Sequence, residues 1–257
     1  MITCRSGEEL VKLRAANQLV ARILEQLRRL VVPGATTAGI DAEAERLVRE
    51  AGAVPAFKGY RGFPATICAS RNHEVVHGIP SAEPLVAGDI LSIDMGVKLD
   101  GFYGDSAVTV AVGAVSPDAQ RLLDVTEASL YQGIEAVRPG ARVSDIGQAV
   151  QAYVEAQGFS VVREFVGHGI GTKLHEEPQI PNYGPGGRGP RLSEGMVLAI
   201  EPMVNAGRAG VRVLSDGWTA ITVDGLLSAH FEHTVAVTVD GAEILTARTP
   251  AEVVGVR

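Results

Sequence analysis

Residues 90–110 read ILSIDMGVKLDGFYGDSAVTV and carry the clearest strand pattern of the chain. Two runs of β-branched and apolar residues flank Asp100-Gly101, a dipeptide typical of the tight turn of a β-hairpin. If the turn spans residues 98–101 with its two ends paired, Asp94 lies directly opposite Asp105. If Asp100-Gly101 alone form the turn, the period of two still places both acids on one face of the sheet. The stretch therefore predicts an antiparallel hairpin that brings two carboxylates together.

Carboxylates on neighbouring strands repel each other, which destabilises a sheet unless a cation lies between them. A solvent-facing pair is the ordinary alternative, because acids are usually exposed. Asp94, however, lies between Ile93 and Met95, and Glu201 occupies a similar place in Ala-Ile-Glu-Pro-Met. Since a buried carboxylate without a partner is very costly, these acids indicate metal ligation or shared protons.

Helical patterns occur early in the chain and are repeated later. Apolar residues recur at helical spacing through residues 7–29, and a second helix is predicted from Ile40 to Glu50. PGATTAGIDAEAERLVREAG (33–52) aligns without a gap on PGARVSDIGQAVQAYVEAQG (139–158). One such match can arise by chance, so further matches in the same order are needed to establish a repeat.

Three further matches do follow in the same order. They pair His77-Gly-Ile with His168-Gly-Ile, the segment around Asp94 with that around Glu201, and the segment around Asp105 with that around Glu232. We therefore expect one domain over residues 1–257, built from two halves, roughly 7–112 and 118–247, that face each other about a pseudo-two-fold axis. The acids of both halves would then converge at the centre.

Alternating, β-branched segments separated by turn residues predict the strands of an antiparallel sheet: residues 90–97, 103–112, 196–204, 218–223 and 232–239. With the helical segments, they predict an α+β fold in which helices cover one side of the sheet.

Composition excludes several classes of protein. The chain of 257 residues has 46% apolar residues and a net charge of −7, and no basic run that would bind nucleic acid. No apolar stretch approaches the ~20 residues of a membrane span, so we expect neither membrane insertion nor export. Cys4 and Cys68 are too few for a disulfide framework, which favours a reducing, cytoplasmic location.

The histidines strengthen the case for a metal site. All six lie in three short segments near the acids, at positions 73, 77, 168, 175, 230 and 233. Four carboxylates with one or two imidazoles suit a pair of divalent ions, and manganese, iron, cobalt and zinc fit such ligands equally well. Two metal ions can hold a bridging hydroxide and polarise a carbonyl, so hydrolysis of an amide or ester is the expected reaction.

Five motifs together resemble those of one known family. They are HGIP (77–80), SIDMG with DGFYGDSA (92–107), GHGIGTKLHEEP (167–178), IEPM (200–203) and SAHFEHT (228–234). In order and spacing they resemble the type I methionine aminopeptidases of metallopeptidase family M24, over nearly the whole chain. The resemblance implies the pita-bread fold, in which two pseudo-symmetric α+β halves surround a central antiparallel sheet with helices on the outer face.

The resemblance also assigns ligands for two divalent ions. Asp94 would bind one ion, His168 and Glu201 would bind the other, and Asp105 and Glu232 would bridge both. All five positions hold the expected type of residue.

Catalytic and substrate-binding residues follow from the same motifs. By resemblance, His77 contacts the substrate, His175 contacts the scissile amide or its oxyanion, and Glu201 moves a proton from water to the leaving amine. The pocket for the methionine side chain would be apolar, which suits an unbranched thioether. Its expected lining is Phe57, Tyr60, Phe63, Cys68, Leu174 and Trp218.

The family activity would be removal of the N-terminal methionine when the second residue is small, by a hydroxide that bridges the two ions. The expected substrates are the N-termini of nascent polypeptides at the ribosome, and we expect a cytoplasmic monomer of the short bacterial type. Three alternatives stay open: an Xaa-Pro aminopeptidase of the same fold, a non-enzymatic pita-bread binding protein, and a creatinase-like hydrolase. His230 replaces the usual Gln, whereas His73 and His233 are interpreted as structural or supporting residues.

Overall fold

The predicted hairpin is present and its turn is Asp100-Gly101. In the computed structural model, which describes residues 2–247, strands β4 (Ile90–Leu99) and β5 (Phe102–Ala111) pair in antiparallel fashion. Both turn residues have positive φ, 48° and 85°, as a tight two-residue turn of this kind requires. Asp94 lies opposite Ala107 rather than opposite Asp105, so the second of the two predicted registers is correct and both acids share one face.

Two helices precede the hairpin. Helix α1 (Gly7–Arg28) matches the predicted helix within one residue, and Ser6 and Glu9 form a capping box at its start. Helix α2 (Thr37–Glu50) begins one turn before the predicted Ile40. The Gly39 N–H donates to the Thr36 hydroxyl at 3.1 Å, and this cap explains the earlier start.

The aligned repeats form equivalent helices. Helix α4 (Val143–Ala156) has the same 14-residue length as α2. Each follows a glycine with positive φ, Gly34 at 89° and Gly140 at 87°. Helix α3 (Pro117–Glu135) precedes α4 as α1 precedes α2, so both halves begin with a pair of helices.

The strands are short outside the hairpin, and every strand pair in residues 2–247 is antiparallel. They form four hydrogen-bonded groups, ordered β1-β4-β2 with β5 on β4, β13-β10-β6, β11-β12-β3, and β15-β14-β9-β7-β8. The predicted strand at 196–204 is interrupted at Glu201-Pro202, because proline cannot donate to a strand ladder. The remaining strands are β1 (Val54–Pro55), β2 (Ile67–Arg71), β3 (Glu74–Val76), β6 (Ser160–Val161), β7 (Gly167–Gly169), β8 (Glu176–Ile180), β9 (Val197–Ile200), β10 (Met203–Asn205), β11 (Val211–Val213), β12 (Ala220–Thr222), β13 (Ser228–His230), β14 (His233–Thr238) and β15 (Gly241–Ile244).

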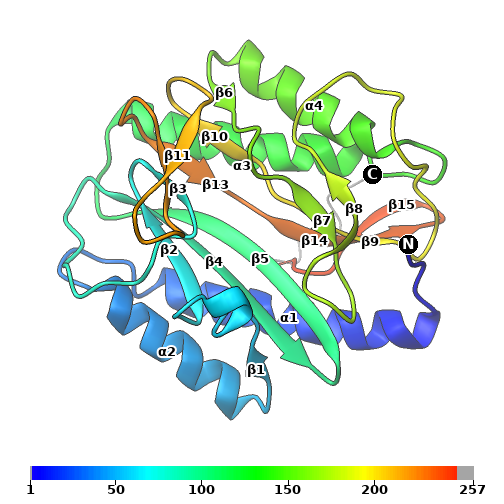
Figure 1. Cartoon of the computed structure of the whole chain (residues 1–257), viewed down its shortest axis with the longest axis horizontal. Coiled ribbons are helices and arrows are strands. Elements are labelled where there is room, and N and C mark those ends of the chain that lie inside the picture. Colours follow the sequence, from blue (N-terminus) through cyan, green and yellow to red (C-terminus); the bar gives the residue numbers. More distant parts are fainter. Residues whose placement is uncertain (1, 248–257) are drawn as a thin grey trace.

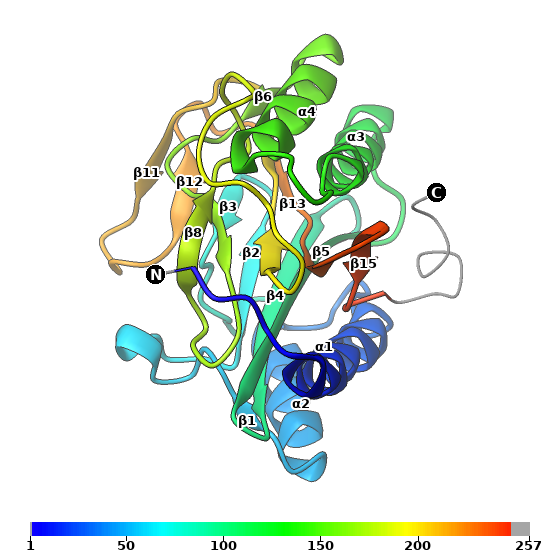
Figure 2. The ribbon, with the colours of Figure 1, turned by 90° about the vertical axis from the view of Figure 1, so that its right-hand side faces the viewer.

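Helices flank the strands at two places. Helix α1 packs on β4 and β5 and α2 lies beside β1 and β2, while α3 and α4 lie together in the other half, next to β13 and β6 (Figures 1 and 2). One apolar cluster joins all of these layers, with fully buried Leu24 from α1, Ile93 from β4, Leu130 from α3 and Leu198 from β9. In residues 2–247, no helix has the length and apolar character needed to cross a membrane.

Helix α1 lies unusually close to β5 at Gly104. A Cβ built at Gly104 would lie 2.8 Å from the carbonyl carbon of Ala16 and 2.9 Å from the Asn17 nitrogen. The fully buried Asn17 side chain accepts a hydrogen bond from the Asp105 N–H at 3.2 Å and donates to the Leu13 carbonyl. The missing side chain at Gly104 therefore lets α1 hold the backbone of the next residue, Asp105.

This contact predicts the effect of Gly104→Ala. The added methyl group would push α1 away from β5, which should reduce the free energy of unfolding by about 1–3 kcal/mol. Chemical denaturation measures the change, with Gly7→Ala as the control, because a Cβ at Gly7 meets no atom within 4 Å. Equal stabilities of the two variants would contradict the proposed role of the close approach.

Candidate metal centre

One cavity contains all the site residues predicted from the sequence. Its volume is about 170 Å³, which is small beside the ~300–1,000 Å³ of typical sites for drug-sized ligands. The predicted metal ligands, His77 and His175 line it together with the predicted apolar residues, which belong to one apolar cluster. The lining consists of Phe57, Tyr60, Arg61, Phe63, Cys68, His77, Asp94, Asp105, His168, Leu174, His175, Glu201, Trp218 and Glu232.

Hydrogen bonds between the two halves fix the backbone of Asp105 and Glu232. The Glu232 N–H donates to the Ala107 carbonyl at 3.0 Å. The Ser106 hydroxyl donates to the Glu232 carbonyl at 2.6 Å, and the Thr234 hydroxyl donates to the Asp105 carbonyl at 2.8 Å. Residues that follow the two acids thus join β5 to Glu232 and the start of β14, which places the two carboxylates beside each other.

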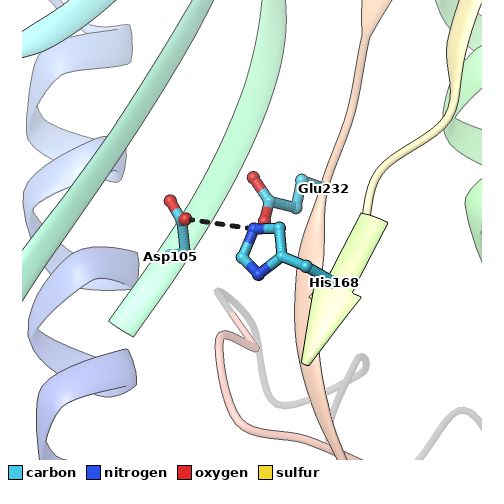
Figure 3. Close-up of side chains that lie close together, drawn as sticks. All are labelled: Asp105, His168 and Glu232. Carbon is cyan, nitrogen blue, oxygen red and sulfur yellow. Dashed lines mark ion pairs between the residues drawn. The ribbon is translucent and has the colours of Figure 1, made fainter. Parts of the chain in front are cut away.

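His168 presents a free ring nitrogen to these acids. Its Nδ1 lies 2.9 Å from the Gly169 carbonyl oxygen, and because a carbonyl only accepts, Nδ1 carries the proton. Nε2 then keeps its lone pair and lies 3.9 Å from Asp105 Oδ2 and 3.6 Å from Glu201 Oε1. Figure 3 shows the ring of His168 facing Asp105 and Glu232. A histidine that binds a metal through one ring nitrogen typically donates a hydrogen bond from the other ring nitrogen, as His168 Nδ1 does here.

The arrangement of donor atoms fits a divalent metal ion. Ligand atoms of Asp105, His168 and Glu232 lie within 4.8 Å of one another, and all three residues are buried. One carboxylate oxygen each of Asp94, Asp105 and Glu232 is buried with no hydrogen-bond partner among residues 2–247. Buried carboxylates need a compensating charge, and a cation bound between them would supply it.

The pKa values of these acids are raised because their charged forms are disfavoured in the cavity. Burial, and after it the neighbouring carboxylates, raise the pKa values of Asp105 and Glu232 well above the ordinary range. Burial also raises the pKa of Glu201, and that of Asp94 to about 7. Burial lowers the pKa of His168 to about 3, so this imidazole is neutral and able to bind a metal at neutral pH.

His77 reaches the cavity through a strained backbone. Its φ is 60°, in the left-handed region that residues other than glycine rarely adopt. The next residue, Gly78, packs on β2, where an added Cβ would lie 2.8 Å from the Ser70 Cα. The His77 ring meets Phe165 edge-on at 5.3 Å between ring centroids and Trp218 at 6.4 Å. The histidine therefore forms part of an aromatic rim.

His175 lines the same cavity and lies beside His168. Its Nδ1 is 2.9 Å from the Tyr60 hydroxyl oxygen, and its ring centroid is 4.3 Å from that of His168. Phe63 meets Trp218 edge-on at 5.2 Å, which builds the apolar wall. Burial, and after it the Asp94 carboxylate, raise the pKa of the Cys68 thiol, which therefore stays neutral.

The other predicted histidines lie outside this lining. His230 is buried, with Nε2 3.7 Å from Glu201 Oε2. Fully buried His233 has Nδ1 2.8 Å from the Thr246 hydroxyl oxygen and Nε2 3.3 Å from the Tyr131 hydroxyl oxygen. These contacts support a structural role for His233, while His73 is exposed.

Three residues that matter to the site did not emerge from the sequence. Arg61 lines the cavity from a turn with positive φ, and no sequence pattern marks it. The Asn182 side chain donates to the Glu201 carbonyl at 3.0 Å. Asn17, which holds Asp105, could have been found, because it is a polar residue within the apolar face of α1.

Comparisons with known proteins agree with this geometry. The model of metallopeptidase family M24 matches residues 11–239. Methionine aminopeptidase 1 of Bacillus subtilis is 55% identical over 246 residues, which cover 96% of this chain and 99% of that protein. The crystal structure of methionine aminopeptidase from Rickettsia prowazekii has a TM-score of 0.95 at 46% identity, covering 96% of this chain and 100% of that one.

A more distant structure shows the extent of the fold. Prolidase from Pyrococcus furiosus has a TM-score of 0.78 at 23% identity, and the match covers 95% of this chain but 65% of that one. This likeness shows a shared fold alone. The matches over nearly the full length confirm both the predicted family and the predicted pita-bread fold. The chain therefore belongs to metallopeptidase family M24 and, within it, to the type I methionine aminopeptidases.

Proposed function

We propose that this chain is a metal-dependent aminopeptidase that removes the N-terminal methionine of polypeptides whose second residue is small. The observation that carries the proposal is one cavity lined by two chemically different sets of residues. Carboxylates and His168 supply polar groups, while aromatic rings and the Cys68 thiol belong to one apolar cluster. The apolar residues suit a thioether side chain, while the polar groups suit the amine and the amide beside it. Relatives named methionine aminopeptidases support this activity.

We further propose that the cavity binds two divalent ions through the five ligands Asp94, Asp105, His168, Glu201 and Glu232. The grouping of buried oxygen atoms around His168 supports the proposal. When bound, such ions polarise a carbonyl and favour deprotonation of water at neutral pH. Cobalt, manganese, iron and zinc all accept this set of oxygen and nitrogen ligands.

Protein groups would then move protons and stabilise charge. Glu201 accepts a proton from the attacking water and delivers it to the leaving nitrogen, as the new C–O bond forms and the C–N bond breaks. His175 lies beside His168 and would donate to the oxygen on which negative charge develops. His77, on the aromatic rim, would contact the substrate beyond the scissile bond.

The setting of the reaction is also a proposal. The first methionine of a new chain is accessible as soon as the chain emerges from the ribosome. We therefore propose that the substrates are nascent polypeptides at the ribosome. We also propose that the enzyme is a monomer in the cytoplasm. We propose that residues 1–257 form a single catalytic domain with halves at roughly 7–112 and 118–247. Residue 1 and residues 248–257 of that domain lie outside the described residues.

Methionine release from the peptide Met-Ala-Ser tests the reaction. After chelation, we expect activity to return on addition of Mn, Fe, Co or Zn, and Glu201→Gln to lower kcat by roughly 10²-fold or more, because it removes the proton carrier. Glu194→Gln is the control, because Glu194 is an exposed acid outside the cavity. Faster cleavage of a Gly-Pro peptide would favour the Xaa-Pro alternative, and no release with any metal would favour a binding protein.

The aromatic rim predicts the preference for a small second residue. We expect kcat/KM for Met-Ala-Ser to exceed that for Met-Leu-Ser by roughly tenfold or more, because a larger side chain would meet the rings of His77 and Phe165. Phe165→Ala should reduce this ratio. The ratio does not depend on the fraction of protein folded, so an unchanged ratio in the variant would remove Phe165 from the determinants of selectivity.

Metal affinity should rise with pH. In the absence of a cation the raised pKa values leave protons on the carboxyl groups, with that of Asp94 at about 7, whereas His168 is already neutral. Binding therefore displaces protons from the acids, and Kd should fall by about tenfold per pH unit for each proton displaced between pH 6 and 8.

Calorimetric titration with Mn²⁺ in two buffers of different ionisation enthalpy counts the released protons directly. Asp94→Asn removes one titrating group and should release fewer protons than the unaltered protein. Binding that is independent of pH and releases no protons would show that the acids are already ionised before the metal binds.

A further inference from the structure

Residues 2–6, the N-terminal strap, cross the molecule before α1 begins. Figure 2 shows this segment passing beside β8 on its way to the helix. The Arg5 N–H donates to the Gly195 carbonyl at 2.7 Å, and the Arg5 side chain is only 5% exposed. Gly195 lies two residues before β9, the strand that leads to Glu201. The strap is therefore fixed at the turn that precedes β9.

The buried guanidinium of Arg5 forms an ion pair with Glu176. It donates to Glu176 Oε2, and the Glu176 side chain is itself 13% exposed. The second oxygen, Oε1, accepts from the Lys173 N–H at 3.0 Å and from the Thr172 hydroxyl at 3.3 Å. One carboxylate thus connects the strap to the loop at residues 171–175.

Two glycines make room for the strap. A Cβ at Gly171 would overlap the guanidinium of Arg5. At Gly195, where φ is 85°, a Cβ would lie 2.7 Å from the Arg5 carbonyl oxygen. Glycine at positions 171 and 195 thus leaves the space that Arg5 occupies between the loop and the turn.

The loop that Glu176 ties down carries His175. Residues 170–175 form no helix or strand, and besides Glu176 the loop is held by the Tyr103 N–H, which donates to the Gly171 carbonyl at 2.8 Å. His175 directly precedes Glu176 and contacts Tyr60 through Nδ1. Any movement of the Glu176 backbone would therefore move the ring of His175.

We propose that Arg5 is a positioning residue for His175, acting through Glu176 and the loop at 171–175. This inference rests on the proposed function of His175 in the hydrolysis. Without Arg5, the carboxylate of Glu176 would lie largely buried without its cation, a costly arrangement. Glu176 would then turn toward solvent and give up its hydrogen bonds to Lys173 and Thr172, which would loosen the loop beside the catalytic cavity.

Arg5→Ala tests the proposal, with Arg14→Ala as a matched control. Arg14 also forms an arginine–glutamate pair, with Glu243 at 2.6 and 2.7 Å, but neither residue lines the cavity. We expect amide hydrogen exchange in residues 171–177 to accelerate by about tenfold in metal-free Arg5→Ala, because local opening becomes easier. We expect kcat for Met-Ala-Ser to fall by about tenfold with a smaller change in KM, because a displaced catalytic group slows the chemical step.

Two observations distinguish a positioning role of Arg5 from a general loss of stability: rescue by a conservative substitution, and faster exchange that is confined to residues 171–177. Arg5→Lys keeps the positive charge and should restore most of both properties, while Arg14→Ala should change neither. Unchanged exchange and kcat in Arg5→Ala, or exchange that rises equally throughout the chain, would overturn the proposal. If the unaltered protein released no methionine with any metal, the proposed function would fail, and the exchange of residues 171–177 alone would still show whether Arg5 holds the loop.

Discussion

Four carboxyl groups, of which Asp105 and Glu232 are buried and Asp94 and Glu201 partly buried, line one cavity and repel one another whenever they are ionised, and the surrounding structure holds them together against that repulsion. Their raised pKa values express the cost, because burial and neighbouring negative charge both disfavour ionisation. The opposing force comes from hydrogen bonds on the backbone of the ligands themselves. The hydroxyl groups of Ser106 and Thr234 donate to the carbonyls of Glu232 and Asp105, respectively, and these bonds join β5 to Glu232 and the start of β14. The two acids therefore cannot separate unless this junction breaks.

Two residues outside the cavity lining, Asn17 and Arg5, contact residues of the site or their neighbours. Helix α1 reaches Asp105 through Asn17, at the place where Gly104 allows close approach. Arg5, just before the same helix, reaches the residue next to His175. The first helix and its preceding segment thus contact both the strand that carries the proposed metal ligand Asp105 and the loop that carries His175, the proposed catalytic histidine. A shift of this helix would consequently change the positions of Asp105 and of the loop that carries His175.

The sequence predicts the local features of this arrangement better than the long-range ones. Side chains alternate between the two faces of a strand, so Asp94 and Asp105 lie on one face of the hairpin with either predicted turn, and the structure confirms this. The start of α2 was predicted late because the cap at Thr36 lies outside the apolar pattern. The contact of Arg5 with Glu176 joins residues that are 171 positions apart, and no periodicity encodes such a pair. Contacts between distant segments depend on packing, which the pattern of single residues does not specify.

His230 shows how the charge balance of the centre constrains its neighbours. Burial lowers the pKa of His230 to about 3, so the imidazole is neutral where the resemblance leads us to expect Gln. Its backbone is fixed by Thr109, and Nε2 lies 3.7 Å from Glu201 Oε2. A neutral imidazole offers an N–H donor and a ring-nitrogen acceptor, much as a glutamine side chain offers N–H donors and a carbonyl acceptor, and it adds no positive charge. A permanent cation at this position would compete with metal ions for the carboxylates. Histidine is therefore compatible with the site because burial keeps it uncharged.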